Sequence, residues 1–162
     1  MRLASPPGVR SCRDGGTWEI ARDARGAQCL YDDLADLARL TERLPESAKV
    51  SLIEDMRTKM KRAERGALEF GTGRQFDVDL IESSRITLEI RLIDHEIPDP
   101  SGASDESVQR HTRVYFTEPE HLDGCLLALS VQSKCPGPEG LDEQDRHAAA
   151  AALRAEDHCA RM

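Results

Sequence analysis

The sequence predicts an α+β domain in which helices pack on one face of a curled, mainly antiparallel sheet. Residues 85–96 (RITLEIRLIDHE) alternate apolar and polar side chains, the period-two pattern of a strand. The same alternation returns in residues 110–118 and 125–134. Residues 30–65 instead repeat apolar residues every three or four positions, as helices do. A strand, two helices, several antiparallel strands and a last helix are typical of the α+β class.

Length and charge limit the kind of protein. A chain of 162 residues, 39% of them hydrophobic, is long enough for one well-packed domain. We expect residues 17–162 to form it and residues 1–16, which lack an apolar run, to be a flexible N-terminal extension. Without a secretory signal or a membrane-spanning stretch, the protein is expected to be cytoplasmic. The net charge of -8 repels phosphate, so a polynucleotide partner would need a local basic patch.

The first elements are a strand and a helical hairpin. The segment 17–21 (TWEIA) is rich in strand formers and predicts an edge strand. Leucines recur every three or four positions along residues 30–44, which predicts a helix with one apolar face, and Pro45 ends that helix. Ser47 is a candidate cap of the second helix, whose apolar stripe continues to Gly66. We therefore expect two antiparallel helices joined by a short turn.

Basic residues crowd the second half of the second helix. Arg57, Lys61 and Arg65 are spaced by four and share one helical face, with only Glu64 opposing them. Two interpretations are open. The residues are a solvated face with favourable charge at a helix C-terminus, or they bind RNA or a partner protein.

The second half of the chain predicts the rest of the sheet. Residues 76–80 form another strand, and residues 82–85 make a tight turn into the strand 85–96. The proline-, glycine- and serine-containing segment at about 97–110 predicts a mobile loop insertion between two strands. A further strand over residues 125–134 ends at CPGPEG, and the alanine-rich residues 142–161 predict a C-terminal helix.

Side-chain parity brings four polar residues together. If the three alternating strands share a sheet, Arg91, Arg113, Tyr115 and Lys134 lie on the face opposite the core. We expect this face to be open to solvent. Any soluble strand puts such residues toward water, so the pattern alone does not distinguish a site from a surface.

The order of four segments resembles a known family. TWEI, ITLEIRLI, TRVYFTEP and LLALSVQSK are similar, in that order, to strands of the RelE/ParE/HigB superfamily of small toxins from bacterial toxin–antitoxin pairs and prophages. The resemblance runs from about Trp18 to about His158. It implies a RelE-like fold, a cognate antitoxin protein as partner, and a metal-independent endoribonuclease that acts on mRNA, with the ribosome as a candidate place of action.

The resemblance implies roles for the four residues of the polar face. RNA cleavage by attack of its own 2′-hydroxyl needs proton transfer and cations at the phosphate, but no metal. Arg91 or Arg113 would clamp the phosphate, Lys134 would add a charge, and Tyr115 would transfer a proton or stack on a base. Further acid–base candidates flank the loop, at His95 and His111.

Other functions stay open. The last strand ends in the single Lys134 where the family commonly has an aromatic residue and two lysines. This favours as an alternative a catalytically weak binding module of the same fold that acts through a protein, either its antitoxin or DNA gyrase. A third possibility is an accessory protein without toxicity. No cofactor is expected, and the scattered histidines and five cysteines lack the spacing of a zinc site or a disulfide framework.

Overall fold

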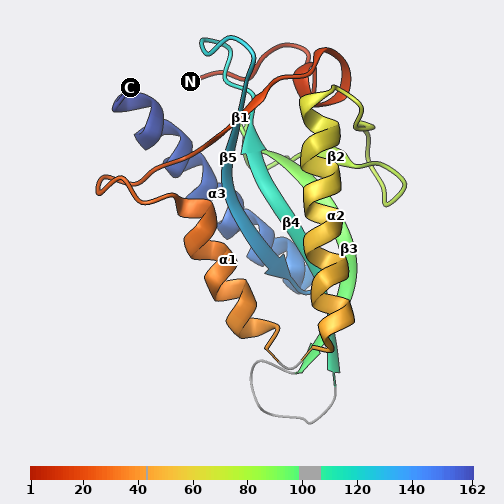
Figure 1. The fold of residues 1–162 in the computed structure, drawn as a ribbon. Coiled ribbons are helices and arrows are strands. Elements are labelled where there is room, and N and C mark those ends of the chain that lie inside the picture. Colours follow the sequence, from red (N-terminus) through yellow and green to blue (C-terminus); the bar gives the residue numbers. More distant parts are fainter. Residues whose placement is uncertain (43, 99–106) are drawn as a thin grey trace.

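The computed structural model describes residues 1–42, 44–98 and 107–162 (Figure 1). The elements are the short π-helix η1 (Arg10–Asp14), β1 (Thr17–Ile20), α1 (Cys29–Leu40), α2 (Glu46–Glu64), β2 (Val78–Leu80), β3 (Leu88–Pro98), β4 (Ser107–Thr117), β5 (Cys125–Lys134) and α3 (Pro138–Ala160). The described strands form one sheet in the order β1-β5-β4-β3-β2. β1 runs parallel to β5, whereas the other neighbours are antiparallel. The predicted α+β class is confirmed.

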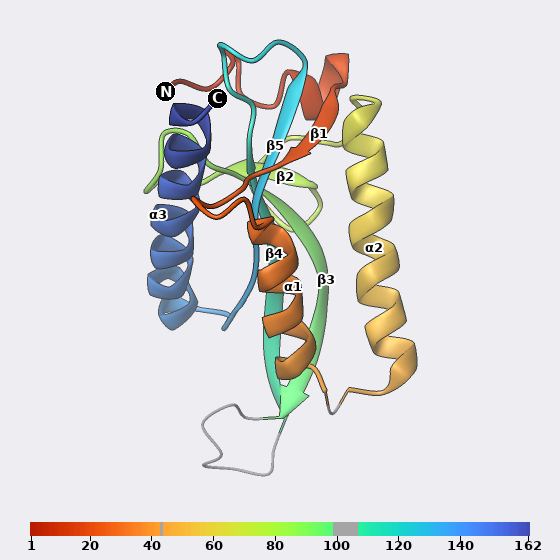
Figure 2. The same cartoon turned by 60° about the vertical axis from the view of Figure 1, so that its left-hand side comes forward.

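The helices cover both faces of the sheet, not one face as predicted. Leu88, Ile90 and Phe116 pack in one apolar cluster with residues of α1 and α2. Tyr115 and Leu129 have the opposite parity and pack with alanines of α3 in a second cluster. Figures 1 and 2 show α1 and α2 on one side of the sheet and α3 on the other. The domain therefore has three layers.

A bulge explains why one alternation could not describe β5. Tyr115 pairs with Ser130, but Phe116 pairs with Ala128, so β5 has an extra residue at Leu129. Leu127 and Leu129 consequently face α3, while Val131 lies in the cluster on the other face. The alternation in residues 125–134 predicts that Leu127, Leu129 and Val131 share one core face, and this prediction is wrong.

The N-terminal segment is packed, contrary to the predicted flexible extension. Leu3 forms a β-bridge with Pro119. The backbone N–H of Arg10 and the hydroxyl of Ser11 donate hydrogen bonds to the two oxygens of the buried Glu118, at 2.8 and 3.0 Å. These bonds satisfy a carboxylate that would be costly to bury alone. Residues 1–16 are therefore part of the domain, and the two termini lie at the same end of it (Figures 1 and 2).

The hairpin of β3 and β4 is longer than predicted. β3 extends to Pro98 and β4 begins at Ser107, and these two residues are register partners. Residues 97–98 and 107–110 of the predicted loop are therefore strand, while residues 99–106 lie outside the described residues. Among the helices of the described ranges, none is long and apolar enough to cross a membrane.

Side chains close the free edge of β5. β1 pairs only with residues Cys125 to Ala128, so in the described structure the second half of β5 has β4 on one side and no strand on the other. Asp33 of α1 accepts hydrogen bonds from the Ser130 hydroxyl at 2.6 Å and from the Val131 backbone N–H at 3.3 Å. Arg154 of α3 donates to both oxygens of the same carboxylate. The pair of the buried Asp33 with the partly exposed Arg154 protects an edge that could otherwise pair with another chain.

Candidate functional site

The strand register places the four predicted site residues on one face of the sheet. Arg91 lies opposite Arg113, and Tyr115 of β4 lies opposite Glu89 of β3. Lys134 at the end of β5 lies opposite His111 of β4, which has the same parity as Arg113. The shared face follows from parity, as predicted. The face is not open, however, because α3 lies over it.

Tyr115 cannot contact RNA in this arrangement. Its side chain is fully buried and packs with Leu129 and Ala148, and its ring centroid lies 6.1 Å from that of His147 of α3. Burial raises the pKa of the phenol far above its ordinary value. Small alanines on α3 leave room for the ring beneath the helix. The predicted exposure of Tyr115 is therefore wrong, and its hydroxyl has no hydrogen-bond partner among the described residues.

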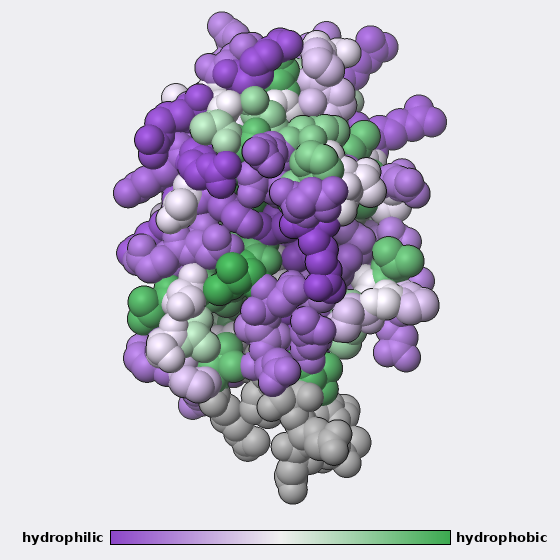
Figure 3. Space-filling view, turned by 90° about the vertical axis from the view of Figure 1, so that its right-hand side faces the viewer, coloured by the Kyte–Doolittle hydropathy of each residue, from purple (hydrophilic) through white to green (hydrophobic). Residues whose placement is uncertain are grey.

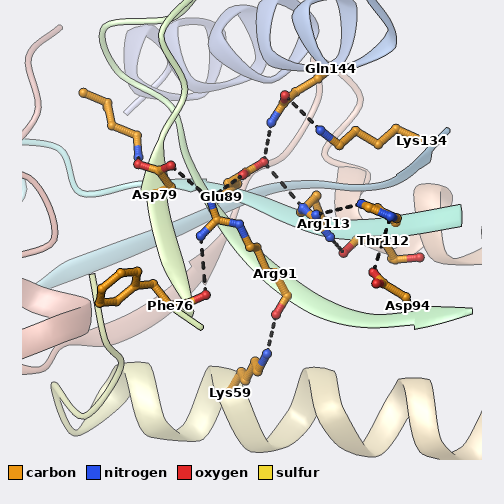
Figure 4. A network of polar contacts seen from close by, with 12 residues as sticks. Lys59, Phe76, Asp79, Glu89, Arg91, Asp94, Thr112, Arg113, Lys134 and Gln144 are labelled. Atoms are coloured by element: carbon orange, nitrogen blue, oxygen red, sulfur yellow. Dashed lines mark hydrogen bonds and ion pairs between the residues drawn. The ribbon is translucent and has the colours of Figure 1, made fainter. Parts of the chain in front are cut away.

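A buried carboxylate occupies the middle of the cationic face. Glu89 accepts a hydrogen bond from Nε2 of Gln144 at 2.6 Å and lies 3.6 Å from Nη2 of Arg91 and 3.7 Å from Nε of Arg113. Lys134 donates to Oε1 of Gln144 at 3.0 Å. Figure 4 shows Glu89 between the two arginines and Gln144. The three predicted cations thus belong to one network centred on Glu89.

Each arginine also has a structural bond. Arg91 donates to Asp79 at 2.9 Å and to the backbone oxygens of Gly71 and Phe76, which ties the 71–76 segment to the sheet. Arg113 donates to the Thr112 backbone oxygen at 3.0 Å. Burial lowers the pKa of Arg113, and the nearby Glu89 opposes this effect. The pKa of Lys134 is also lowered by burial. Both shifts reflect the loss of water around the charged groups of Arg113 and Lys134.

The two histidine candidates are buried. Nε2 of His111 lies 3.8 Å from Asp94, and His95 contacts the Thr112 hydroxyl at 3.3 Å. Burial lowers the pKa of both imidazoles, so each is held in its neutral form. His111 is on the face of the cations, whereas His95 pairs with Arg110 and has the other parity. Neither histidine is exposed to a strand of RNA.

The predicted basic patch lies elsewhere, on the outer surface of α2. Arg57, Lys61 and Arg65 are all exposed. Arg57 pairs with Glu54 at 3.3 Å across one helical turn. Ile53 lies four residues before Arg57 and therefore on the same face of α2. It lines an apolar groove between α1 and α2. The groove has a volume of about 130 Å³ and is lined by Leu34, Leu37, Ala38, Thr41, Lys49, Leu52 and Ile53.

Sequence reasoning missed the partners of the cations. Glu89 has the same parity as Arg91 within one strand, so the alternation itself contained the signal that it lies beside the arginines. Gln144 comes from α3, which no local pattern assigned to this face.

In the described part of the chain, no group of three or more His, Cys, Asp or Glu side chains could hold a metal ion.

Comparisons with protein-family models, with curated proteins and with solved structures find no match to this chain. The RelE-like fold and the toxin-like function implied by the sequence resemblance are therefore expectations that these comparisons do not test.

Proposed function

We propose that this chain is a binding module that holds an acidic, amphipathic helix of a partner protein in the groove between α1 and α2. The observation that supports this proposal is that apolar and basic residues follow one another along one face of α2. Ile53 lies in the apolar groove, and the residues that follow it at intervals of four are exposed and basic: Arg57, Lys61 and Arg65. These three residues form a basic surface in a chain of net charge -8.

The chemistry of the groove favours a helix over a small molecule. A volume of about 130 Å³ is below the range of about 300–1,000 Å³ typical of small-molecule pockets. Its walls are mostly aliphatic, and the lining residue Ile53 is about half exposed, at 45%. An apolar helix face can place its anchors there, while acidic residues on its flank meet the basic residues of α2. Opposite charges would also speed the encounter.

The position of Glu89 argues against phosphoryl chemistry. A phosphate held by Arg91, Arg113 and Lys134 would have to replace the carboxylate that lies among them. The residue proposed for proton transfer, Tyr115, is buried under α3. The two findings support the binding function implied by the family resemblance over the nuclease function.

A metal-independent endoribonuclease of a toxin–antitoxin or prophage locus is the second candidate. One observation favours it, the convergence of Arg91, Arg113 and Lys134 on one face of the sheet. This function requires mRNA cleavage, with or without ribosomes, that persists in chelator and leaves a cyclic phosphate end. Lys134→Ala should then slow cleavage about a hundredfold. The binding function requires that intact RNA survives incubation with the protein.

Binding of a labelled model helix tests the first proposal. The probe is a peptide about three heptads long with leucine at a and d and glutamate elsewhere. We expect anisotropy to report binding, and Arg57→Glu with Lys61→Glu to weaken it about tenfold or more, or about 1.4 kcal/mol. The matched control reverses the exposed Arg25 and Arg146, outside α2. Equal weakening by both double variants would contradict the proposal, as would self-association at the groove that excludes the peptide.

A further inference from the structure

A pocket of about 390 Å³ lies between the N-terminal segment and the connection from β2 to β3. Figure 2 shows both segments at the same end of the domain. Three of the residues that line the pocket are polar: Arg2, Ser5 and Arg85. The side of the molecule on which α2 and β3 lie is mostly hydrophilic (Figure 3), whereas the other lining residues of this pocket are apolar: Met1, Leu3, Ala4, Pro7, Leu80 and Ile86. We propose that this pocket binds a small molecule that combines an aliphatic chain with a carboxylate.

Backbone hydrogen bonds hold the N-terminal wall of the pocket in place. The N–H of Ala4 donates to the backbone oxygen of Glu118 at 2.8 Å, and the N–H of Glu120 donates to the backbone oxygen of Arg2 at 2.9 Å. Leu3, which lies between them, forms a β-bridge to the same segment after β4. The wall is therefore formed before a ligand arrives, so binding does not have to order this segment.

The inner surface of the pocket joins the two apolar clusters of the domain. Ile86 belongs to the cluster under α3 and is 9% exposed, whereas Leu80 packs against the cluster under α1 and α2. Leu3 packs against both clusters. An aliphatic chain that lies against these side chains leaves water, and its binding free energy becomes more favourable roughly in proportion to the apolar area that it buries. This surface therefore favours a ligand with an aliphatic chain.

Arg2 and Arg85 supply positive charge that the described residues do not neutralise. Both side chains are exposed, and neither makes an ion pair with a described carboxylate. The planar fork of arginine matches the two oxygens of a carboxylate. Water screens charges at exposed positions, so we expect the arginines to orient the carboxylate and the apolar walls to supply most of the affinity.

The size of the pocket favours a small molecule over a segment of a protein. Its volume lies within the range of about 300–1,000 Å³ typical of small-molecule sites, whereas the groove between α1 and α2 is smaller. The pocket and the groove share no lining residue. The pocket is therefore a second site, beyond the proposed helix-binding function, and the two can be tested independently.

The test is calorimetric titration of the full chain with octanoate at constant ionic strength. Two matched ligands separate the contributions of the chain and of the charge. Butyrate has the same carboxylate on a shorter chain, and octylamine has a chain of the same length with a positive charge at neutral pH. We expect octanoate to bind about tenfold or more tightly than either of them.

Charge reversal tests the role of the two arginines. Arg85→Glu and Arg2→Glu should each weaken octanoate binding about fivefold or more, whereas Arg85→Lys keeps the charge and should stay within about threefold of wild type. The matched control Arg146→Glu makes the same change of charge at an exposed position of α3 outside the pocket and should leave binding unchanged. Urea unfolding verifies that each variant is folded. Because Arg2 and Arg85 belong to different segments, either variant alone suffices for the test.

The outcomes separate a specific site from weak surface binding. Octanoate binding that depends on the chain length and on both arginines supports the proposal. The proposal is overturned if octanoate does not bind, if butyrate or octylamine binds as tightly, or if Arg146→Glu weakens binding as much as Arg85→Glu. The acidic model helix should bind equally well with octanoate present, and displacement of the helix by octanoate would contradict two separate sites.

Discussion

Replacement of Glu89 by glutamine should reveal how strongly this carboxylate holds the cationic face together. Glu89→Gln keeps the shape of the side chain but removes the negative charge 3.6 Å from Arg91 and 3.7 Å from Arg113. Removing one partner of a buried ion pair costs about 3–5 kcal/mol. We expect the lower end, about 3 kcal/mol, because Arg91 keeps its bond to Asp79.

Urea unfolding followed by the fluorescence of Trp18 measures this change. Trp18 packs against Phe116 of the core, at a centroid distance of 5.5 Å, so its emission reports loss of the sheet. A loss of about 3 kcal/mol corresponds to about 6–12 °C in Tm for a chain of this length. The control Glu54→Gln alters an exposed pair and should stay within about 0.5 kcal/mol of wild type. A stability of Glu89→Gln equal to that of the control would refute the role assigned to this network.

Tyr115→Phe removes a buried hydroxyl that has no hydrogen-bond partner among the described residues. The variant should therefore be as stable to unfolding as the wild type, or up to about 1 kcal/mol more stable. A loss of more than about 1 kcal/mol would show that the hydroxyl makes a hydrogen bond that the structure lacks. Asp33→Ala should lower the free energy of unfolding by about 3 kcal/mol and should promote self-association through the uncovered edge of β5. If light scattering shows that the variant stays monomeric at high concentration, Asp33 does not protect this edge. The free energy of unfolding should also fall as the pH drops below about 6.5. Burial lowers the folded-state pKa of three histidines, so the unfolded chain binds more protons in this range: His95, His111 and His147. Each histidine then lowers the stability by up to about 1.4 kcal/mol per pH unit. A flat stability profile between pH 7.5 and 5.5 would contradict these pKa shifts.

The sequence pattern predicted what local periodicity determines. Leu88 and Ile90 alternate with Glu89 and Arg91, and the sheet separates them onto opposite faces as expected. The covering of the second face by α3 was not predicted, although residues 126–129 (LLAL) are apolar at both parities. Such a run is typical of a strand buried on both sides. The alternation in β4 alone predicts an exposed Tyr115, and this prediction is wrong because α3 covers that face of the sheet.

Long-range partners are what the sequence could not supply. The packing of Arg10 and Ser11 depends on Glu118, more than 100 residues away in the chain. Parity correctly brought Arg91 and Arg113 together. It carried no information on Gln144, which reaches Glu89 from α3. The positions of the candidate site were therefore predictable, but its charge compensation was not.

The most direct test of the binding function compares two single variants in the same peptide titration. Ile53→Asp places a charge in the apolar groove at a half-exposed position, whereas Lys134→Ala removes a cation of the opposite sheet face. We predict that Ile53→Asp weakens binding of the acidic helix about tenfold or more, while Lys134→Ala leaves it unchanged. Loss of binding in Lys134→Ala with full binding in Ile53→Asp would contradict the proposal and place the partner surface on the sheet.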